Sequence, residues 1–238
     1  MLRALLKGIA AATPGQCAVC HAWPAQPVCE ACVARFAQPR PRCMRCALPL
    51  PASFQTGTAI CVQCLRVPPP LDACRAAVSY SYPWSALIAD YKFHGQPGWA
   101  HSFAVLMRSA PWVEPALDEA ALVLPMPLSA ERLAERGFNQ ALELARRLAP
   151  GKTDSALLLR VRDTAPQTAL DRQQRLLNVK DAFALDPLRA AEVRARDIVL
   201  VDDVMTSGAS LFTAAGALRR AGAGRITALV LARTDAPD

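Results

Sequence analysis

The stretch "IVLVDDVMTSGAS" (residues 198–210) joins an apolar run, two adjacent carboxylates and a loop of small residues. Ile198 to Val201 predict a buried strand, because continuous apolar runs are typical of parallel sheets covered on both faces. Asp202 and Asp203 then stand at the carboxyl end of that strand, where α/β sheets bind ligands. A helix is expected next, with Leu211, Ala215 and Leu218 facing inward.

The loop between strand and helix has the residue types of an anion site, namely Thr206, Ser207, Gly208, Ala209 and Ser210. Small residues let backbone N–H groups approach an anion, and a helix N-terminus favours negative charge. Carboxylates beside a bound phosphate would repel it. The acidic pair is therefore expected to bind another group at the site, such as the sugar hydroxyls of the ligand or a Mg²⁺ ion. A ribose 5-phosphate meets both demands, whereas the simpler alternative is that the aspartates only cap the helix.

The surrounding sequence alternates apolar runs with amphipathic helical segments, which predicts an α/β fold with a mainly parallel sheet. Further strands are expected at 75–82, 121–127, 156–162 and 225–233. The chain contains neither a Walker A lysine motif nor a G-x-G-x-x-G motif, so neither a P-loop nor a dinucleotide site is supported.

The chain has 238 residues, of which 53% are hydrophobic and 20% charged, so it can build a substantial core. The proline-rich segment "RVPPPLD" (66–72) predicts a boundary between an N-terminal module, 1–68, and a larger domain, 69–238. The first residues predict an amphipathic helix, docked on the protein or on a membrane surface, without a secretory h-region. No apolar run is long enough to span a bilayer. We therefore expect a cytoplasmic protein without a transmembrane segment.

Eight of the nine cysteines form four C-x-x-C pairs within 48 residues. Pairs with this spacing can turn two thiolates onto one ion, and two pairs complete a tetrahedral zinc site. The sequence therefore predicts two structural Zn²⁺ sites in sequential order: Cys17, Cys20, Cys29 and Cys32 in one, and Cys43, Cys46, Cys61 and Cys64 in the other. A cross-braced pairing is the alternative.

Two other readings of the cysteines are weaker. "CAVCH" (17–21) matches the attachment motif of c-type haem, but haem attachment would leave the other three pairs unexplained. The remaining cysteine, Cys74, is expected to be a small buried residue.

The net charge of +7 is concentrated in residues 1–80, which hold eight Lys and Arg against Glu30 and Asp72. Two zinc–tetrathiolate sites, each with a net charge of −2, would lower that surplus of +6 to near +2. A basic patch of Arg35, Arg40, Arg42 and Arg45 could still contact nucleic-acid phosphates. A purely structural cap on the second domain is the alternative.

Several motifs together identify a family resemblance. "VLVDDVMTSGAS" resembles the motif with which type I phosphoribosyltransferases bind phosphoribosyl pyrophosphate (PRPP). The C-x-x-C pairs, "YKFHG" (91–95), "PMPLSAERLAERGFNQ" (125–140) and "APQTALDRQQRLLNV" (165–179) resemble the ComF family, the competence-protein F group. Ser210 departs from the usual threonine but keeps the hydroxyl.

This resemblance implies a type I phosphoribosyltransferase fold, with a five-stranded sheet and an N-terminal double zinc ribbon. It implies that Asp202 and Asp203 bind ribose hydroxyls of PRPP with Mg²⁺, and that Thr206 to Ser210 hold the 5-phosphate. Residues 163–178 would form a loop that closes over the site. The side chains expected to face pyrophosphate are Lys92, Arg136, Arg172 and Arg175.

The resemblance further implies a role in natural competence, with single-stranded DNA and other competence proteins as partners. PRPP binding has more support than catalysis, because no hood that would select a nucleophile is recognisable. The alternatives are an active phosphoribosyltransferase for an unidentified acceptor and a zinc-stabilised PRPP sensor without a DNA role.

Overall fold

The computed structural model describes residues 15–23, 25–54, 58–161 and 182–235. The chain divides into two compact units, Met1–Gln38 and Pro39–Asp238. The first unit contains four paired cysteines and helix α2 (Glu30–Phe36). The second unit contains the central sheet and the other four paired cysteines. The amphipathic helix expected at the start of the chain lies outside the described residues.

The central sheet confirms the predicted α/β fold. Its four described strands lie in the order β1 (Ala73–Ser79), β6 (Ile226–Arg233), β5 (Ile198–Met205) and β2 (Leu122–Pro125), and every neighbouring pair is parallel. All eight residues of β6 are buried. Such a run is expected of an inner strand covered on both faces.

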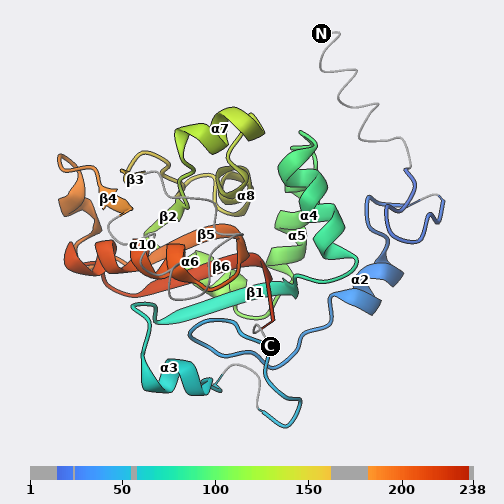
Figure 1. Ribbon diagram of the computed structural model, residues 1–238, viewed down its shortest axis with the longest axis horizontal. Coiled ribbons are helices and arrows are strands. Elements are labelled where there is room, and N and C mark those ends of the chain that lie inside the picture. The colour runs from blue at the N-terminus through green and yellow to red at the C-terminus, as the bar shows by residue number, and fades with distance from the viewer. Residues whose placement is uncertain (1–14, 24, 55–57, 162–181, 236–238) are drawn as a thin grey trace. The chain divides into compact units, whose positions relative to one another are not determined.

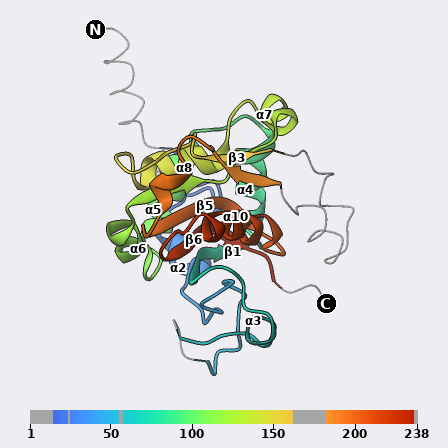
Figure 2. The same ribbon diagram turned by 90° about the vertical axis from the view of Figure 1, so that its left-hand side faces the viewer.

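Helices cover both faces of this sheet. Figure 2 shows α10 (Ala209–Arg220) on one side and α5 (Trp99–Arg108) and α6 (Val113–Glu119) on the other. The remaining helices of this unit are α3 (Val62–Arg66), α4 (Trp84–Phe93), α7 (Ala130–Arg136), α8 (Gln140–Leu148) and the 3₁₀ helix η2 (Ala190–Val193). α8 contacts β2 and β5, so it lies close to the strand that carries the aspartate pair.

The segment expected to form a fifth strand does not join the described sheet. β3 (Leu158–Arg160) pairs antiparallel with β4 (Phe183–Leu185) in a separate ribbon (Figure 1). Beside β2, Thr153 makes only an isolated parallel bridge with Val123. Burial explains the difference, because Leu158 is buried whereas Leu159 is 36% exposed. This alternation suits a ribbon with one covered face rather than an inner strand.

The second group of cysteines lies against the β1 edge of the sheet. The Cys74 backbone N–H donates to the Met44 carbonyl at 2.7 Å, and α3 lies below β1 in both ribbon views (Figures 1 and 2). Leu71 is buried, and the Asp72 carboxylate accepts a hydrogen bond from the Ile226 backbone at 2.7 Å. Residues on both sides of the proline run therefore pack within one unit. Independent folding of 69–238 stays a prediction.

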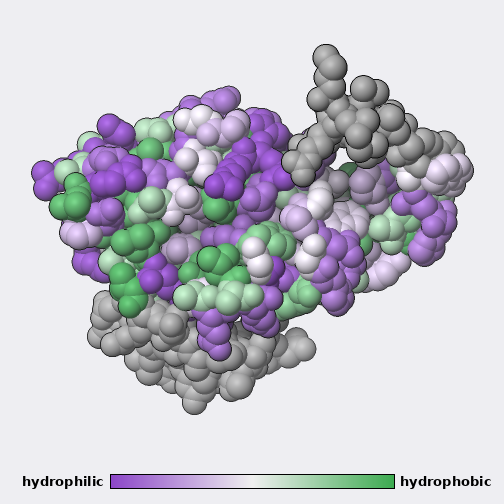
Figure 3. Space-filling model, turned by 90° about the horizontal axis from the view of Figure 1, so that it is seen from above, coloured by the Kyte–Doolittle hydropathy of each residue, from purple (hydrophilic) through white to green (hydrophobic). Residues whose placement is uncertain are grey.

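The described surface offers no sign of a membrane span, since none of the helices built from the described residues has the length and apolar character required. Seen from above, hydrophilic residues alternate with small, separate hydrophobic areas (Figure 3).

Candidate ligand and metal sites

The aspartate pair lies near the carboxyl end of β5, as predicted. Asp203 is only 6% exposed and Asp202 is half-buried. Each carboxylate accepts a hydrogen bond from the next backbone N–H, Asp203 N at 2.9 Å and Val204 N at 2.6 Å. The two side chains are thus held in place by their own strand.

Lys92 of α4 lies beside this pair. Its Nζ atom is 3.0 Å from Asp203 Oδ1, and both side chains are largely buried. The preceding residue, Tyr91, anchors the end of α4 by donating from its hydroxyl to the Gln140 carbonyl at 2.9 Å. Burial first, and then the Asp203 charge, raise the pKa of Tyr91. The "YKFHG" segment therefore reaches the aspartates.

Arg136, the last residue of α7, approaches from another side. Its guanidinium stacks over the Phe93 ring at 5.3 Å and donates to Gln140 Oε1 at 3.1 Å. Among the described residues, Arg136 Nε and Gln140 Nε2 are buried donors without a hydrogen-bond partner. Buried donors usually find an acceptor. These two donors are therefore suited to an anionic oxygen of a ligand. Sequence reasoning named Arg136 and missed Gln140, although "RGFNQ" contains both.

Asp202 is held in an unfavourable setting for a charge. Burial first, and then the neighbouring Asp203 carboxylate, raise the pKa of Asp202 to about 7, although Lys92 and Arg136 act in the opposite direction. Two close carboxylates disfavour each other's ionised form. A cation or a set of hydroxyl donors at this place would relieve that repulsion.

The loop after β5 turns sharply into α10. Gly208 adopts a left-handed conformation with φ 83° as the residue before the helix. Ser207 Oγ accepts a hydrogen bond from the Ala209 backbone at 3.3 Å. A Cβ atom at Gly208 would lie 2.5 Å from Met205 Cε and 2.7 Å from Phe212 Cζ, so any other residue would have to displace these two side chains. Thr206 is exposed, while Ser207 and Ser210 are half-buried.

The structure thus brings Lys92, Arg136 and the two aspartates together, with the 206–210 loop continuing from the same strand. Arg172 and Arg175, and the loop expected to close over the site, lie outside the described residues.

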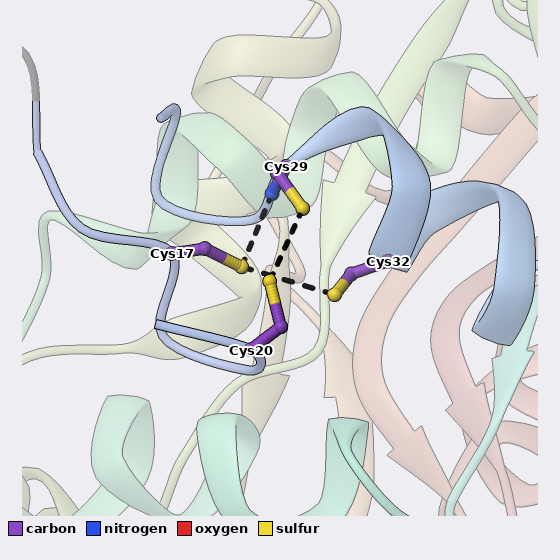
Figure 4. A group of neighbouring side chains, drawn as sticks. All are labelled: Cys17, Cys20, Cys29 and Cys32. Atoms are coloured by element: carbon purple, nitrogen blue, oxygen red, sulfur yellow. Dashed lines mark hydrogen bonds between the residues drawn. The ribbon is translucent and has the colours of Figure 1, made fainter. Parts of the chain in front are cut away.

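The cysteines form two compact groups in the predicted sequential order, which excludes the cross-braced alternative. Within each group, the four Sγ atoms lie within 4.8 Å of one another. In the first group, Cys17 and Cys20 come from a loop, and Cys29 and Cys32 from the start of α2 (Figure 4).

The sulfur geometry fits a tetrahedral zinc ion. A Zn–S bond of about 2.3 Å places the sulfurs of a regular tetrahedron about 3.8 Å apart. The Cys17–Cys32 and Cys20–Cys29 sulfur distances are 3.9 and 3.6 Å, and the Cys46–Cys61 distance is 3.7 Å. The hydrogen bond between Cys43 and Cys46 lowers the pKa of Cys43 and raises the pKa of Cys46, so without a metal the two thiols share one proton. A thiolate is the form that binds metal.

The two groups repeat one local structure, which spacing alone did not reveal. Cys29 and Cys61 each precede a helix, with φ −70° and −71°, and their backbone N–H groups donate to Cys17 and Cys43 Sγ at 3.4 and 3.3 Å. The residue after each first C-x-x-C pair is left-handed, with φ 60° at His21 and 54° at Ala47. Burial distinguishes them: all four cysteines are buried only in the second group.

The arginines expected to form a basic patch have partners within the protein. Arg35 lies over the Phe36 ring at 5.1 Å. Arg40 and Arg42 both donate to Ser79 Oγ, at 3.0 and 3.1 Å, and Arg45 Nη1 lies 3.4 Å from the Leu71 carbonyl. Arg42 and Arg45 are half-buried, so part of each side chain packs against the edge of the sheet and only part faces solvent.

Comparison with known proteins finds relatives along most of the chain. The DNA utilization protein YhgH of Salmonella typhimurium is 32% identical over 232 residues, covering 93% of this chain and 98% of that protein. Competence protein F of Haemophilus influenzae is 30% identical over 201 residues, 81% of this chain and 85% of the relative. Competence protein ComFC of Bacillus subtilis is 28% identical over 161 residues, 67% and 64% of the two chains.

No model of a protein family matches the chain. The match to the Salmonella typhimurium protein nevertheless spans almost the whole of both chains at 32% identity. The chain therefore belongs to the ComF family, together with DNA utilization protein YhgH and competence protein F.

Proposed function

We propose that the chain binds PRPP, or a related ribose 5-phosphate, together with Mg²⁺ at the carboxyl end of β5. The observation that carries this proposal is the meeting of the aspartate pair, Lys92 and Arg136 beside a glycine loop that opens α10. The loop would hold the 5-phosphate through backbone N–H groups. The carboxylates would accept hydrogen bonds from ribose hydroxyls, while Mg²⁺ and the cations balance the pyrophosphate.

Two features support an anionic ligand in particular. Arg136 Nε and Gln140 Nε2 are buried donors that need an acceptor, and pyrophosphate oxygens would supply it. Burial and the Asp203 charge raise the pKa of Asp202, although Lys92 pairs with Asp203, so the acidic pair has room for a further cation or hydroxyl donor. Both features concern the same few side chains as the family motifs.

We also propose a cytoplasmic role in natural competence, in the handling of internalised single-stranded DNA with other competence proteins. The names of the relatives support this role. The basic patch adds little to it, since its arginines have partners in the protein. Zinc in the two cysteine groups would be structural.

The alternative is an active transferase that moves ribose 5-phosphate from PRPP to an unidentified acceptor. Pyrophosphate release in the presence of candidate acceptors would distinguish it from a binding protein. The zinc-stabilised PRPP sensor predicts binding without any effect on DNA uptake.

Changing both aspartates tests the ligand proposal. Asp202→Asn with Asp203→Asn should weaken PRPP binding about 100-fold or more, because each lost hydrogen bond to a charged acceptor contributes about 1.5–3 kcal/mol. Isothermal calorimetry with and without Mg²⁺ measures the affinity, and circular dichroism checks the fold. Asp118→Asn, an exposed aspartate of α6, is the matched control.

Unchanged affinity in the double variant would contradict the proposal and leave the aspartates with a structural role within β5. Capping of α10 is not that role, because Gly208 precedes the helix and both carboxylates bond to N–H groups of their own strand. If binding and transformation by external DNA are lost together, the site serves competence. If binding is lost but DNA uptake persists, the ligand site and the DNA role are separate.

A further inference from the structure

The two cysteine groups share one local structure but differ in what surrounds them. The second group belongs to a buried cluster that also contains Leu71, Cys74, Met205 and Ala209. Met205 ends β5 and Ala209 begins α10, so this cluster reaches both ends of the 206–210 loop. The core beneath the candidate phosphate loop is thus partly built from the second cysteine group.

Arg233, the last residue of β6, makes the polar connection between the two. Its side chain is only 6% exposed. Its Nε donates to the Cys46 carbonyl at 3.0 Å, and its Nη1 donates to the Met205 carbonyl at 3.3 Å and to the Thr234 carbonyl at 2.6 Å. One guanidinium therefore bonds a cysteine of the second group and the residue from which the loop departs.

The charge of Arg233 points to the same group. Within the part of the chain that is described, its hydrogen bonds all go to uncharged oxygens, and no carboxylate forms an ion pair with it. A buried guanidinium without a counter-charge is costly. Four thiolates around one Zn²⁺ carry a net charge of −2, which would supply that counter-charge beside Cys46.

Met205 passes this support on to the loop. Its carbonyl accepts from Arg233 and from the Thr234 backbone at 3.1 Å, and the Cys74 Sγ lies 3.6 Å from its Sδ. Its methyl group occupies the space that a side chain at Gly208 would need. Met205 therefore packs directly against Gly208, and its position determines the space available to the turn at Gly208.

We infer that Arg233 is a positioning residue, and that the second cysteine site orders the 206–210 loop through it. The first cysteine site, in the other unit, has no such part. The ligand of this loop rests on the proposed function, whereas the order of the loop can be measured without any ligand.

Hydrogen–deuterium exchange of the full chain with its metal tests the inference. The amides to follow are those whose hydrogen bonds hold the loop in place: Ala209 N to Ser207 Oγ, Phe212 N to the Gly208 carbonyl, and Thr234 N to the Met205 carbonyl. Cys46→Ser should speed exchange of these amides at least tenfold, since the metal and the charge that holds Arg233 are lost. Cys20→Ser, at the equivalent position of the first group, should leave these amides unchanged. Arg233→Met should resemble Cys46→Ser, and Arg233→Lys should restore part of the protection because it keeps the charge.

The faster exchange in Arg233→Met must be confined to the loop, because a general loss of stability would speed exchange throughout the second unit. Amides of Ile198 to Val201 should stay protected in Arg233→Met. Equal exchange in the Cys20 and Cys46 variants, or an unaltered loop in Arg233→Met, would overturn the inference. If Cys46→Ser does not fold, the comparison of Arg233→Met with Arg233→Lys still tests whether Arg233 orders the loop.

PRPP calorimetry on the same proteins separates this inference from the proposed function. We expect at least tenfold weaker binding for Arg233→Met and unchanged binding for Cys20→Ser. If the unaltered protein does not bind PRPP, the proposed function fails, and the exchange result still decides whether Arg233 orders the loop.

Discussion

At the scale of single residues, the two neighbouring carboxylates of the candidate site lower the stability of the folded protein. Asp202 and Asp203 are adjacent and largely enclosed, and Lys92 pairs with only one of them, at 3.0 Å from Asp203. Burial and the neighbouring charge therefore raise the pKa of Asp202 to about 7, from an ordinary value of 3.8. Groups with strongly shifted pKa values are concentrated at functional sites, where stability is lost for the sake of binding.

This shift predicts a pH-dependent gain in stability for Asp202→Asn. The folded protein holds the Asp202 proton more tightly than the unfolded chain does. Protonated Asp202 therefore adds to the free energy of unfolding below pH 3.8, and this added stability is lost as the pH rises through 7. Asparagine does not titrate. The melting temperature of the variant should therefore exceed that of the unaltered protein by more at pH 8 than at pH 5.5.

Scanning calorimetry at the two pH values measures this difference, without ligand in either case. The same comparison with Asp118→Asn, a change at an exposed aspartate away from the site, is the control. A difference for Asp202→Asn that is constant, or that shrinks towards pH 8, would show that Asp202 is ionised normally in the folded protein.

The positions of individual residues were predictable only where the local sequence determines them. The aspartates, Gly208 and the eight paired cysteines follow from strand, turn and spacing rules. The contact between Lys92 and Asp203, and the buried donors of Arg136 and Gln140, depend on how α4, α7 and α8 pack around β5. No local pattern specifies that packing. For Lys92 and Arg136, the family resemblance provided the only signal.

At the scale of elements, the connection from β5 to α10 depends on one glycine. Gly208 is left-handed and has no room for a Cβ atom, whereas Gly137, at the end of α7, is left-handed with open space around it. A left-handed conformation costs an L-residue roughly 1–2 kcal/mol. Gly137 thus isolates the conformational cost, and Gly208 adds the cost of displacing Met205 and Phe212.

Gly208→Ala should therefore lower the free energy of unfolding by more than Gly137→Ala does. We expect about 1–2 kcal/mol for Gly137→Ala and about 1–3 kcal/mol more for Gly208→Ala, because overpacking a core typically costs that much. Urea denaturation gives both values. Equal losses would mean that Met205 and Phe212 move aside freely, and the packing against Gly208 would then be softer than its contacts indicate.

The strands also show where pattern reasoning succeeds and where it fails. β1, β2, β5 and β6 were predicted because long apolar runs have few alternatives in a chain with interspersed helices. The 156–162 segment also begins with an apolar run but contains two arginines, and its residues 158–160 form a ribbon with β4. Its partner is more than twenty residues away, and the choice between joining the sheet edge and forming a ribbon depends on tertiary packing that the run itself does not encode.

At the scale of the whole molecule, one cysteine structure is used twice in different settings. In the described part of the first unit few other side chains are buried, so metal binding would provide much of its folding free energy. In the second unit it continues the core of the sheet, and its Met44 and Cys46 carbonyls accept hydrogen bonds from Cys74 N and Arg233 Nε. Loss of metal should therefore have different consequences at the two sites.

The purified protein should contain two zinc ions per chain, measured by elemental analysis, because both sulfur groups have tetrahedral dimensions. Cys20→Ser and Cys46→Ser should each lower the content to one. Cys20→Ser should leave the thermal unfolding of the sheet nearly unchanged, since the first unit has its own contacts. Cys46→Ser should lower that transition by several degrees, because about 1 kcal/mol shifts the melting temperature of a domain of this size by roughly 2–4 °C. One equivalent of metal in the unaltered protein, or iron in place of zinc, would contradict the assignment.

Equal effects of the two variants on the thermal unfolding of the sheet would show that the two units depend on each other for stability. The division after Gln38 would then separate two groups of contacts but not two units that unfold independently.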